Sequence, residues 1–175
     1  MNPYQLLKKM ANKPIMYGWY DYVNKKIITP NDKEFDIEGY FDKNCRVLKP
    51  LEVWRTGVET CWGTTLLEWF ELKRMGLNPR AFYIEGNDAT HSAVYYEDEG
   101  KIFWFEYSWN VYRGIHGPYN NVDRFFEILL QQHIANQKSY KTVKFLNKSF
   151  NVEALVNLNT DIKSTDFINI AKKAY

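Results

Sequence analysis

The chain has few of the cysteines that stabilise small secreted proteins through disulfide bonds or metal sites. Only two of its 175 residues are cysteines, Cys45 and Cys61. Two cysteines without a Cys-x-x-Cys pair or a Cys/His cluster make neither a disulfide framework nor a metal site. We therefore expect two free thiols, no metal and no cofactor.

Long apolar runs and a strong charge imbalance are also missing. No stretch approaches the eighteen or more apolar residues of a membrane span, and residues 1–14 lack the apolar core of a signal peptide. Lys and Arg total 23 against 21 Asp and Glu, and the charges form no basic stripe. The sequence therefore predicts a cytoplasmic protein that binds neither membrane nor nucleic acid, and it indicates no oligomeric state.

Apolar and aromatic residues, by contrast, are plentiful. Hydrophobic residues make up 45% of the chain, and aromatic residues make up 17%. Residues 1–175 can therefore bury a substantial core. No linker or internal repeat divides them, so we expect a single domain. The aromatic rings exceed what a core of this size must hide, and the surplus could line a groove.

The segment from Gly57 to Trp109 carries the residues that suggest a function. Thr60 is a suitable N-cap, which puts Cys61 in the first turn of a helix that runs to about Met75, before Gly76. The apolar residues of this helix cover more than one narrow stripe, so it should be the core helix, buried on most sides. They are Trp62, Leu66, Leu67, Trp69, Phe70 and Leu72.

Strand patterns follow this helix. The residues between the second and third strands carry turn signals, so these two strands should form a hairpin. The expected strands are 80–85, 91–97 and 102–108. Outside this segment the patterns predict helices over 3–11, over about 122–136 and after Ser164, with short strands within KKIIT, EFDIEGYFD and TVKFLN.

Cys61 can be interpreted in two ways. A helix N-terminus favours negative charge, which lowers the pKa of a thiol and makes it a nucleophile. A free cysteine in a tryptophan-rich core can equally be a buried structural residue. Its position alone does not decide between them.

The hairpin allows a test of whether Cys61 has a catalytic partner. His91 and Glu106 point to the same face only if the loop between their strands has an even number of residues. A loop of two residues at Glu99-Gly100, or of four at 98–101, pairs Glu97 with Ile102. Glu106 then lies diagonally from His91, about 7 Å away at the backbone, where its carboxylate can hold the imidazole.

A three-residue loop would put His91 and Glu106 on opposite faces. The alternatives also include a Glu106 paired with a surface lysine and a His91 that is simply a polar residue at a strand end. His116, in a Gly-Pro loop that could border the site, is a weaker candidate for the base. His133 is expected to be an ordinary residue of a helix surface.

A cysteine at a helix start, a histidine on a strand and an acid on the next strand resemble the transglutaminase-like superfamily. The resemblance covers about residues 50–110, in GVETCWGTTLLEWFELKRMGLNPRAFYI and HSAVYYEDEGKIFWFEYSW. It implies an α+β fold with a papain-like core, in which a nucleophile helix packs on an antiparallel sheet. Residues 1–49 and 111–175 would then be elaborations packed on that core.

The resemblance also implies roles for three residues. Cys61 would be the nucleophile, His91 the general base and acid, and Glu106 the orienting carboxylate, where the family typically has Asp. The amide of Cys61 would be one oxyanion donor; the second is unassigned, although the indoles of Trp19 and Trp54 are conceivable donors.

The expected activity is cysteine-dependent acyl transfer on an amide or peptide bond. Because the resemblance is to mostly small bacterial-type proteins of protease character, hydrolysis of a peptide or protein substrate is favoured over cross-linking. Two alternatives stay open. One is a catalytically silent domain that binds peptide or protein through an aromatic groove, and the other is a redox role for Cys45 and Cys61.

Overall fold

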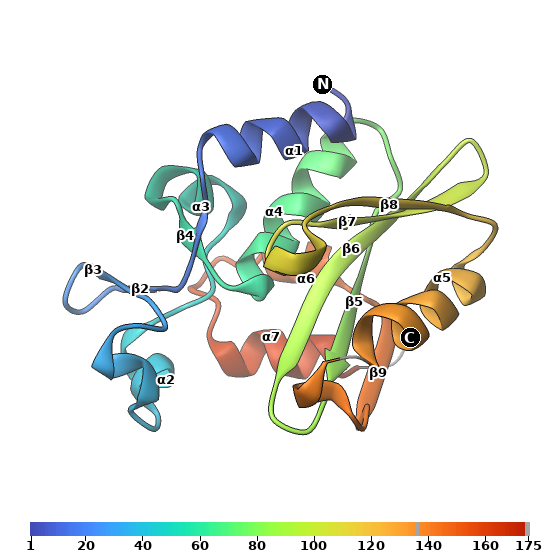
Figure 1. The fold of residues 1–175 in the computed structure, drawn as a ribbon. Helices are drawn as coiled ribbons and strands as arrows, with labels where there is room; N and C mark the ends of the chain where they lie inside the picture. Colours follow the sequence, from blue (N-terminus) through green and yellow to red (C-terminus); the bar gives the residue numbers. More distant parts are fainter. Residues whose placement is uncertain (136, 174–175) are drawn as a thin grey trace.

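A five-stranded antiparallel sheet forms the centre of the fold in the computed structural model, which describes residues 1–135 and 137–173. The strand order is β8-β7-β6-β5-β9, so the two edges come from the later part of the chain (Figure 1). The strands are β5 (Arg80–Glu85), β6 (Thr90–Asp98), β7 (Lys101–Glu106), β8 (Gly114–Tyr119) and β9 (Phe145–Phe150).

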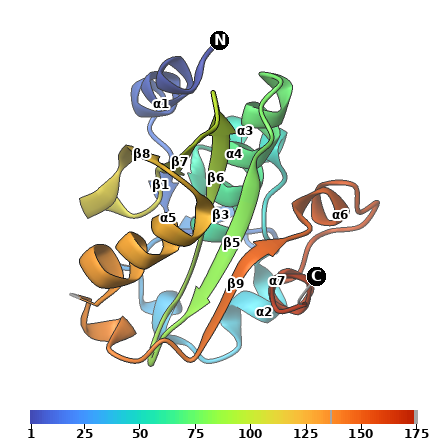
Figure 2. The same ribbon diagram turned by 90° about the vertical axis from the view of Figure 1, so that its right-hand side faces the viewer.

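Helices cover both faces of this sheet. Figure 2 shows α5 on one side of the sheet and α6 and α7 on the other. Each side has its own cluster of buried apolar residues, and the larger cluster contains the central helix α4. The helices on the sheet are α4 (Cys61–Arg74), α5 (Val122–Ile128) with the π-helical turn η3 (Leu129–Ile134), α6 (Val152–Val156) and α7 (Ser164–Ala171).

The N-terminal part of the chain packs beside α4, which α3 and β4 contact directly. Two short strand pairs form there: β1 runs parallel to β4, and β2 runs antiparallel to β3. The elements are α1 (Pro3–Asn12), β1 (Met16–Tyr17), β2 (Trp19–Asp21), β3 (Lys26–Ile28), η1 (Lys33–Asp36), α2 (Tyr40–Asn44), α3 (Pro50–Thr56) and β4 (Val58–Glu59). Two further turns of 3-10 helix are η2 (Asn110–Tyr112) and η4 (Lys138–Tyr140).

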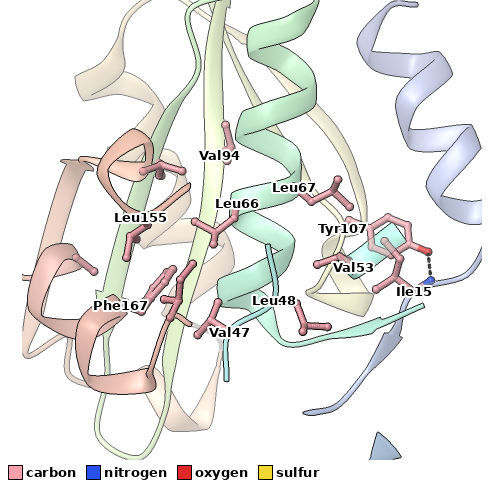
Figure 3. Packing of buried hydrophobic residues seen from close by; sticks show 14 of the residues in the cluster. Ile15, Val47, Leu48, Val53, Leu66, Leu67, Val94, Tyr107, Leu155 and Phe167 are labelled. Atoms are coloured by element: carbon pink, nitrogen blue, oxygen red, sulfur yellow. Dashed lines mark hydrogen bonds between the residues drawn. The ribbon is translucent and has the colours of Figure 1, made fainter. Parts of the chain in front are cut away.

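The prediction that α4 is the core helix is confirmed. Thr60 caps it by accepting a hydrogen bond from the amide of Trp62 at 3.4 Å, and the helix ends at Arg74, before Gly76. In Figure 3, Leu67 points toward Val53 and Tyr107, while Leu66 projects from the other side of the helix. Because apolar side chains on several sides of α4 are buried, the helix is fixed in the middle of the fold.

The predicted hairpin is also confirmed. The register pairs Glu97 with Ile102 and Asp98 with Lys101, so the loop between β6 and β7 is the two-residue turn Glu99-Gly100. Both turn residues have positive φ, 48° at Glu99 and 72° at Gly100, as a tight primed turn requires. The loop is therefore even.

Some expected elements differ in the structure. EFDIEGYFD was predicted to contain a strand, but it folds into η1 and the beginning of α2 instead. The helix expected over 122–136 becomes α5 followed by the π-helical η3, and residue 136 lies outside the described residues. The strand in TVKFLN begins only at Phe145.

Several elements were missed by the sequence patterns, β8 and α3 among them. RGIHGPY reads as a loop because of its glycines and proline, yet it contains β8, an edge strand, where the side facing away from the sheet tolerates proline. Helix α3 was also missed. Among the described residues, no helix is both long and apolar enough to cross a membrane.

Candidate active site

Cys61 is the first residue of α4 and is almost buried, with 5% of its surface exposed. Its carbonyl accepts hydrogen bonds from the hydroxyls of Thr65 at 2.7 Å and Ser92 at 3.2 Å, which tie this turn to strand β6. The first amides of a helix have no partner within the helix, so they point toward the region where the thiol lies.

His91 stands beside Cys61 at the beginning of β6, where it pairs with Ile84 of β5. The imidazole is 6% exposed, and its Nε2 lies 2.8 Å from Oε2 of Glu106. This contact leaves Nδ1 for the thiol of Cys61, and hydrogen bonding between the two side chains is one of the causes that raise the pKa of His91. The histidine therefore lies between the thiol and the carboxylate.

Glu106 ends β7 and is completely buried. Besides His91, its carboxylate accepts hydrogen bonds from the amide of Trp109 at 2.7 Å and the hydroxyl of Ser108 at 3.1 Å. The register pairs Val94 with Phe105, so Glu106 lies on the diagonal from His91 that the even loop predicts. Glutamate is long enough to span this diagonal.

The charge on His91 is set by two opposing effects. Burial lowers the pKa of the imidazole, because it penalises the charged form. The negative charge of Glu106, together with hydrogen bonds to Cys61 and Glu106, outweighs burial and raises the pKa to about 10. At neutral pH, His91 is therefore a cation held by a carboxylate next to a thiol.

Aromatic side chains form the walls around these three residues. The ring of Trp109 lies 4.7 Å from that of His91 and 5.8 Å from that of Tyr140. Burial raises the pKa of Tyr140, and charge at Cys61 adds to the effect. Tyr17 also lies near Cys61, but it is 47% exposed. No pattern in the sequence indicated Tyr17 or Tyr140.

Two buried carboxyl groups beside the site were also not predicted. Glu59 accepts hydrogen bonds from the amides of Leu48 and Thr60, both at 2.8 Å, and burial raises its pKa to about 8. Glu68, on α4, accepts the amide of Tyr107 at 3.1 Å, and burial and the charge of Glu106 raise its pKa well above the usual value. A buried polar position within an apolar helix was the one available signal for Glu68.

The other histidines pack among aromatic rings, which connect to His91 through Tyr112 and Trp109. His116 stacks on Trp104 with ring centroids 4.5 Å apart, and its Nε2 is 2.5 Å from the carbonyl oxygen of Tyr112. His133 is half-buried and packs against Trp104 and Tyr112, so the expectation of an ordinary helix-surface residue was wrong. Both histidines belong to an aromatic cluster on the α5 side of the sheet.

The remaining residues considered from the sequence also have defined places. The indole of Trp54 donates to Glu71 at 2.9 Å and is therefore engaged. Trp19 packs in the core, with its ring centroid 5.0 Å from that of Phe41. Cys45 and Cys61 are both buried free thiols.

A groove of about 730 Å³ in the described part of the chain does not include the triad. It lies at the other end of α4, and its lining includes Trp69, Lys73, Arg80, Tyr95 and Phe150. The thiol of Cys61, 5% exposed, lies outside this groove. Comparison of the chain with protein families, with curated protein sequences and with solved structures gives no match.

Proposed function

We propose that this protein is a cysteine-dependent acyl-transfer enzyme with a transglutaminase-like, papain-like core, acting on an amide or peptide bond. The observation that supports the proposal best is the position of His91 between the thiol of Cys61 and the carboxylate of Glu106. Nε2 of His91 lies 2.8 Å from Oε2 of Glu106. A nucleophile, a base and a group that orients the base are the parts such a reaction needs.

The charges favour an ion pair before substrate binds. With the pKa of His91 raised to about 10, the imidazolium can hold the sulfur of Cys61 as a thiolate at neutral pH. The thiolate attacks the carbonyl carbon, and the π electrons of the C=O bond move to oxygen. As the tetrahedral intermediate collapses, the C–N bond breaks and His91 gives its proton to the leaving nitrogen.

The resulting thioester is resolved by the same residues. His91, now neutral, takes a proton from an incoming water molecule, whose oxygen attacks the acyl carbon. The C–S bond then breaks, which releases a carboxylic acid and restores the thiolate and imidazolium. An amine in place of water would give transamidation, and the family resemblance favours water with a peptide or protein substrate.

Thiol reactivity gives the first test. In a Cys45→Ser variant, Cys61 is the sole thiol, so its alkylation by iodoacetamide can be followed by mass spectrometry from about pH 5 to pH 9. A thiolate paired with imidazolium keeps reacting at about pH 6, whereas an ordinary thiol with a pKa of about 8.5 does not. We expect alkylation at about pH 6 to be at least about 10-fold faster than for a free cysteine.

The matched controls are changes at the partner and at the other cysteine. Adding His91→Asn to Cys45→Ser should remove the fast reaction at about pH 6, because the ion pair is lost. Cys61→Ser leaves Cys45, whose pKa burial raises to about 12, and this thiol should react slowly throughout. If Cys61 reacts no faster than a free cysteine, or if His91→Asn changes nothing, the enzyme proposal fails and the silent binding domain is favoured.

A further inference from the structure

Tyr17 lies beside the nucleophile because of the parallel pairing of β1 and β4. The register sets Tyr17 opposite Glu59, two residues before Cys61, and the amide of Gly18 donates to the carbonyl of Glu59 at 3.3 Å. The preceding chain is anchored as well, since the hydroxyl of Tyr107 donates to the carbonyl of Met10 at 2.9 Å. This segment is therefore fixed next to the first turn of α4.

Exposure distinguishes Tyr17 from the other groups that interact with the thiol. His91, Tyr83, Tyr140 and Glu68 are all buried, whereas Tyr17 is 47% exposed. The thiol itself is only 5% exposed. Of these groups, Tyr17 is therefore the one that a substrate approaching from solvent can contact.

The hydroxyl of Tyr17 is available as a hydrogen-bond donor. Within residues 1–135 and 137–173, no group makes a hydrogen bond with this hydroxyl. Negative charge at Cys61 is the largest cause that raises the pKa of Tyr17, followed by burial and by charge at Glu59. The phenol consequently keeps its proton at neutral pH and lies close to the place where charge develops.

We propose that the Tyr17 hydroxyl is the second oxyanion donor of the site, acting together with the backbone amide of Cys61. This inference rests on the proposed acyl-transfer function. When the thiolate adds to the carbonyl, the C=O electron pair moves to oxygen, and two donors on this oxygen stabilise the intermediate. No bond to Tyr17 forms or breaks, and its proton stays on the phenol oxygen.

The substitution that tests this role is Tyr17→Phe, which removes one oxygen and keeps the ring. The probe is p-nitrophenyl acetate, whose acetyl group passes through a tetrahedral intermediate as it transfers to Cys61. Release of nitrophenolate and mass spectrometry of the acetylated protein give kcat, KM and the acylation rate. We expect Tyr17→Phe to lower kcat about 10²- to 10³-fold, with KM changed little.

Iodoacetamide alkylation of the same proteins separates this inference from the proposed function. Alkylation displaces iodide from a saturated carbon and forms no oxyanion, so its rate at about pH 6 should be the same in Tyr17→Phe as in the parent protein. A structural disturbance of the thiol would slow both reactions. Tyr4→Phe, the same change at an exposed residue of α1, should alter neither reaction.

Each other outcome overturns the inference. If the parent protein acylates and Tyr17→Phe acylates equally fast, Tyr17 is not a donor, although the proposed function stands. If Tyr140→Phe loses acylation selectively and Tyr17→Phe does not, the donor is Tyr140. If the parent protein neither alkylates rapidly nor acylates, the proposed function and the role of Tyr17 fail together.

Discussion

At the scale of single residues, Glu106 shows how a buried charge is tolerated in an aromatic strand. An unpaired carboxylate in this place would be costly, but three groups share its charge: the ring of His91, the amide of Trp109 and the hydroxyl of Ser108. The hydrogen bonds from Ser108 and Trp109 come from the turn that follows β7. They therefore hold the carboxylate in place independently of His91. Glu106 is thus oriented by its own strand end.

The pKa of His91 should therefore depend on Glu106. With Glu106→Gln the negative charge is lost, burial still lowers the pKa and only Cys61 still raises it, so we expect the pKa to fall from about 10 toward its usual 6.5. Glu106→Asp keeps the charge further away and should give an intermediate value. NMR titration of the histidine ring signals measures both, with His91→Asn used to assign the signal. An unchanged pKa in Glu106→Gln would show that the carboxylate does not hold the ring.

The residues that could be predicted from sequence are those whose placement depends on nearby chain. Cys61 follows a recognisable cap, and the pairing of His91 with Glu106 depends on one two-residue turn. Tyr17 and Glu59 could not be found in this way, because a parallel pairing between distant segments brings them to the site. Parallel strands leave no short turn signal in the sequence.

At the scale of elements, the start of α4 is built around the carboxyl group of Glu59. A Cβ atom on Gly63 would lie 2.3 Å from Cδ of Glu59, so this turn of the helix can pack here only with glycine. The carboxyl cannot easily move aside, because the amides of Leu48 and Thr60 and the hydroxyl of Thr60 hold it. The first turn that carries Cys61 is fixed by a neighbour from β4.

This packing predicts that the effect of Gly63→Ala on the free energy of unfolding changes sign when Glu59 is removed. Gly63→Ala alone should destabilise the protein by about 1–3 kcal/mol through overpacking. In a Glu59→Ala background the obstruction is gone, and the same change should stabilise by up to about 1 kcal/mol through helix propensity. Urea unfolding of the four proteins measures the coupling. Equal effects of Gly63→Ala in both backgrounds would contradict the contact.

Element prediction succeeded where the chain has a strong period and failed where tertiary packing decides. Helix α4 and the β6–β7 hairpin have clear apolar patterns and turn residues. Strand β8 exists only because β7 offers its edge, and its own sequence, rich in glycine, has little strand propensity. EFDIEGYFD has alternating apolar residues, yet it packs as short helical turns beside β2 and α7.

At the scale of the whole molecule, the site and its support make folding depend on pH. Glu59 and His91 are both buried and both hold protons more tightly in the folded protein, with pKa values of about 8 and about 10. An acid or base whose pKa is raised by folding stabilises the fold while it is protonated. Stability is therefore highest below the unfolded pKa and is lost as pH rises through the folded one.

For Glu59 this loss runs from its unfolded value of 4.5 to about 8, and for His91 from 6.5 to about 10. Each retained proton contributes up to about 1.4 kcal/mol per pH unit, so the thermal midpoint should fall across both windows. The fall should be steepest between 6.5 and about 8, where the windows overlap. Calorimetry over this range measures it.

Variants separate the contributions of Glu59 and His91. The comparison uses the slope of the thermal midpoint against pH, so a change in absolute stability does not affect it. Glu59→Ala should flatten the dependence between 4.5 and 6.5 and leave the part that His91 causes between 6.5 and about 10. His91→Asn should flatten the dependence between about 8 and about 10 and leave the part that Glu59 causes between 4.5 and about 8. A thermal midpoint that rises with pH through this range in the parent protein would contradict this account. It would mean that the folded protein holds Glu59 ionised and His91 neutral, and the thiolate–imidazolium pair would lose its basis.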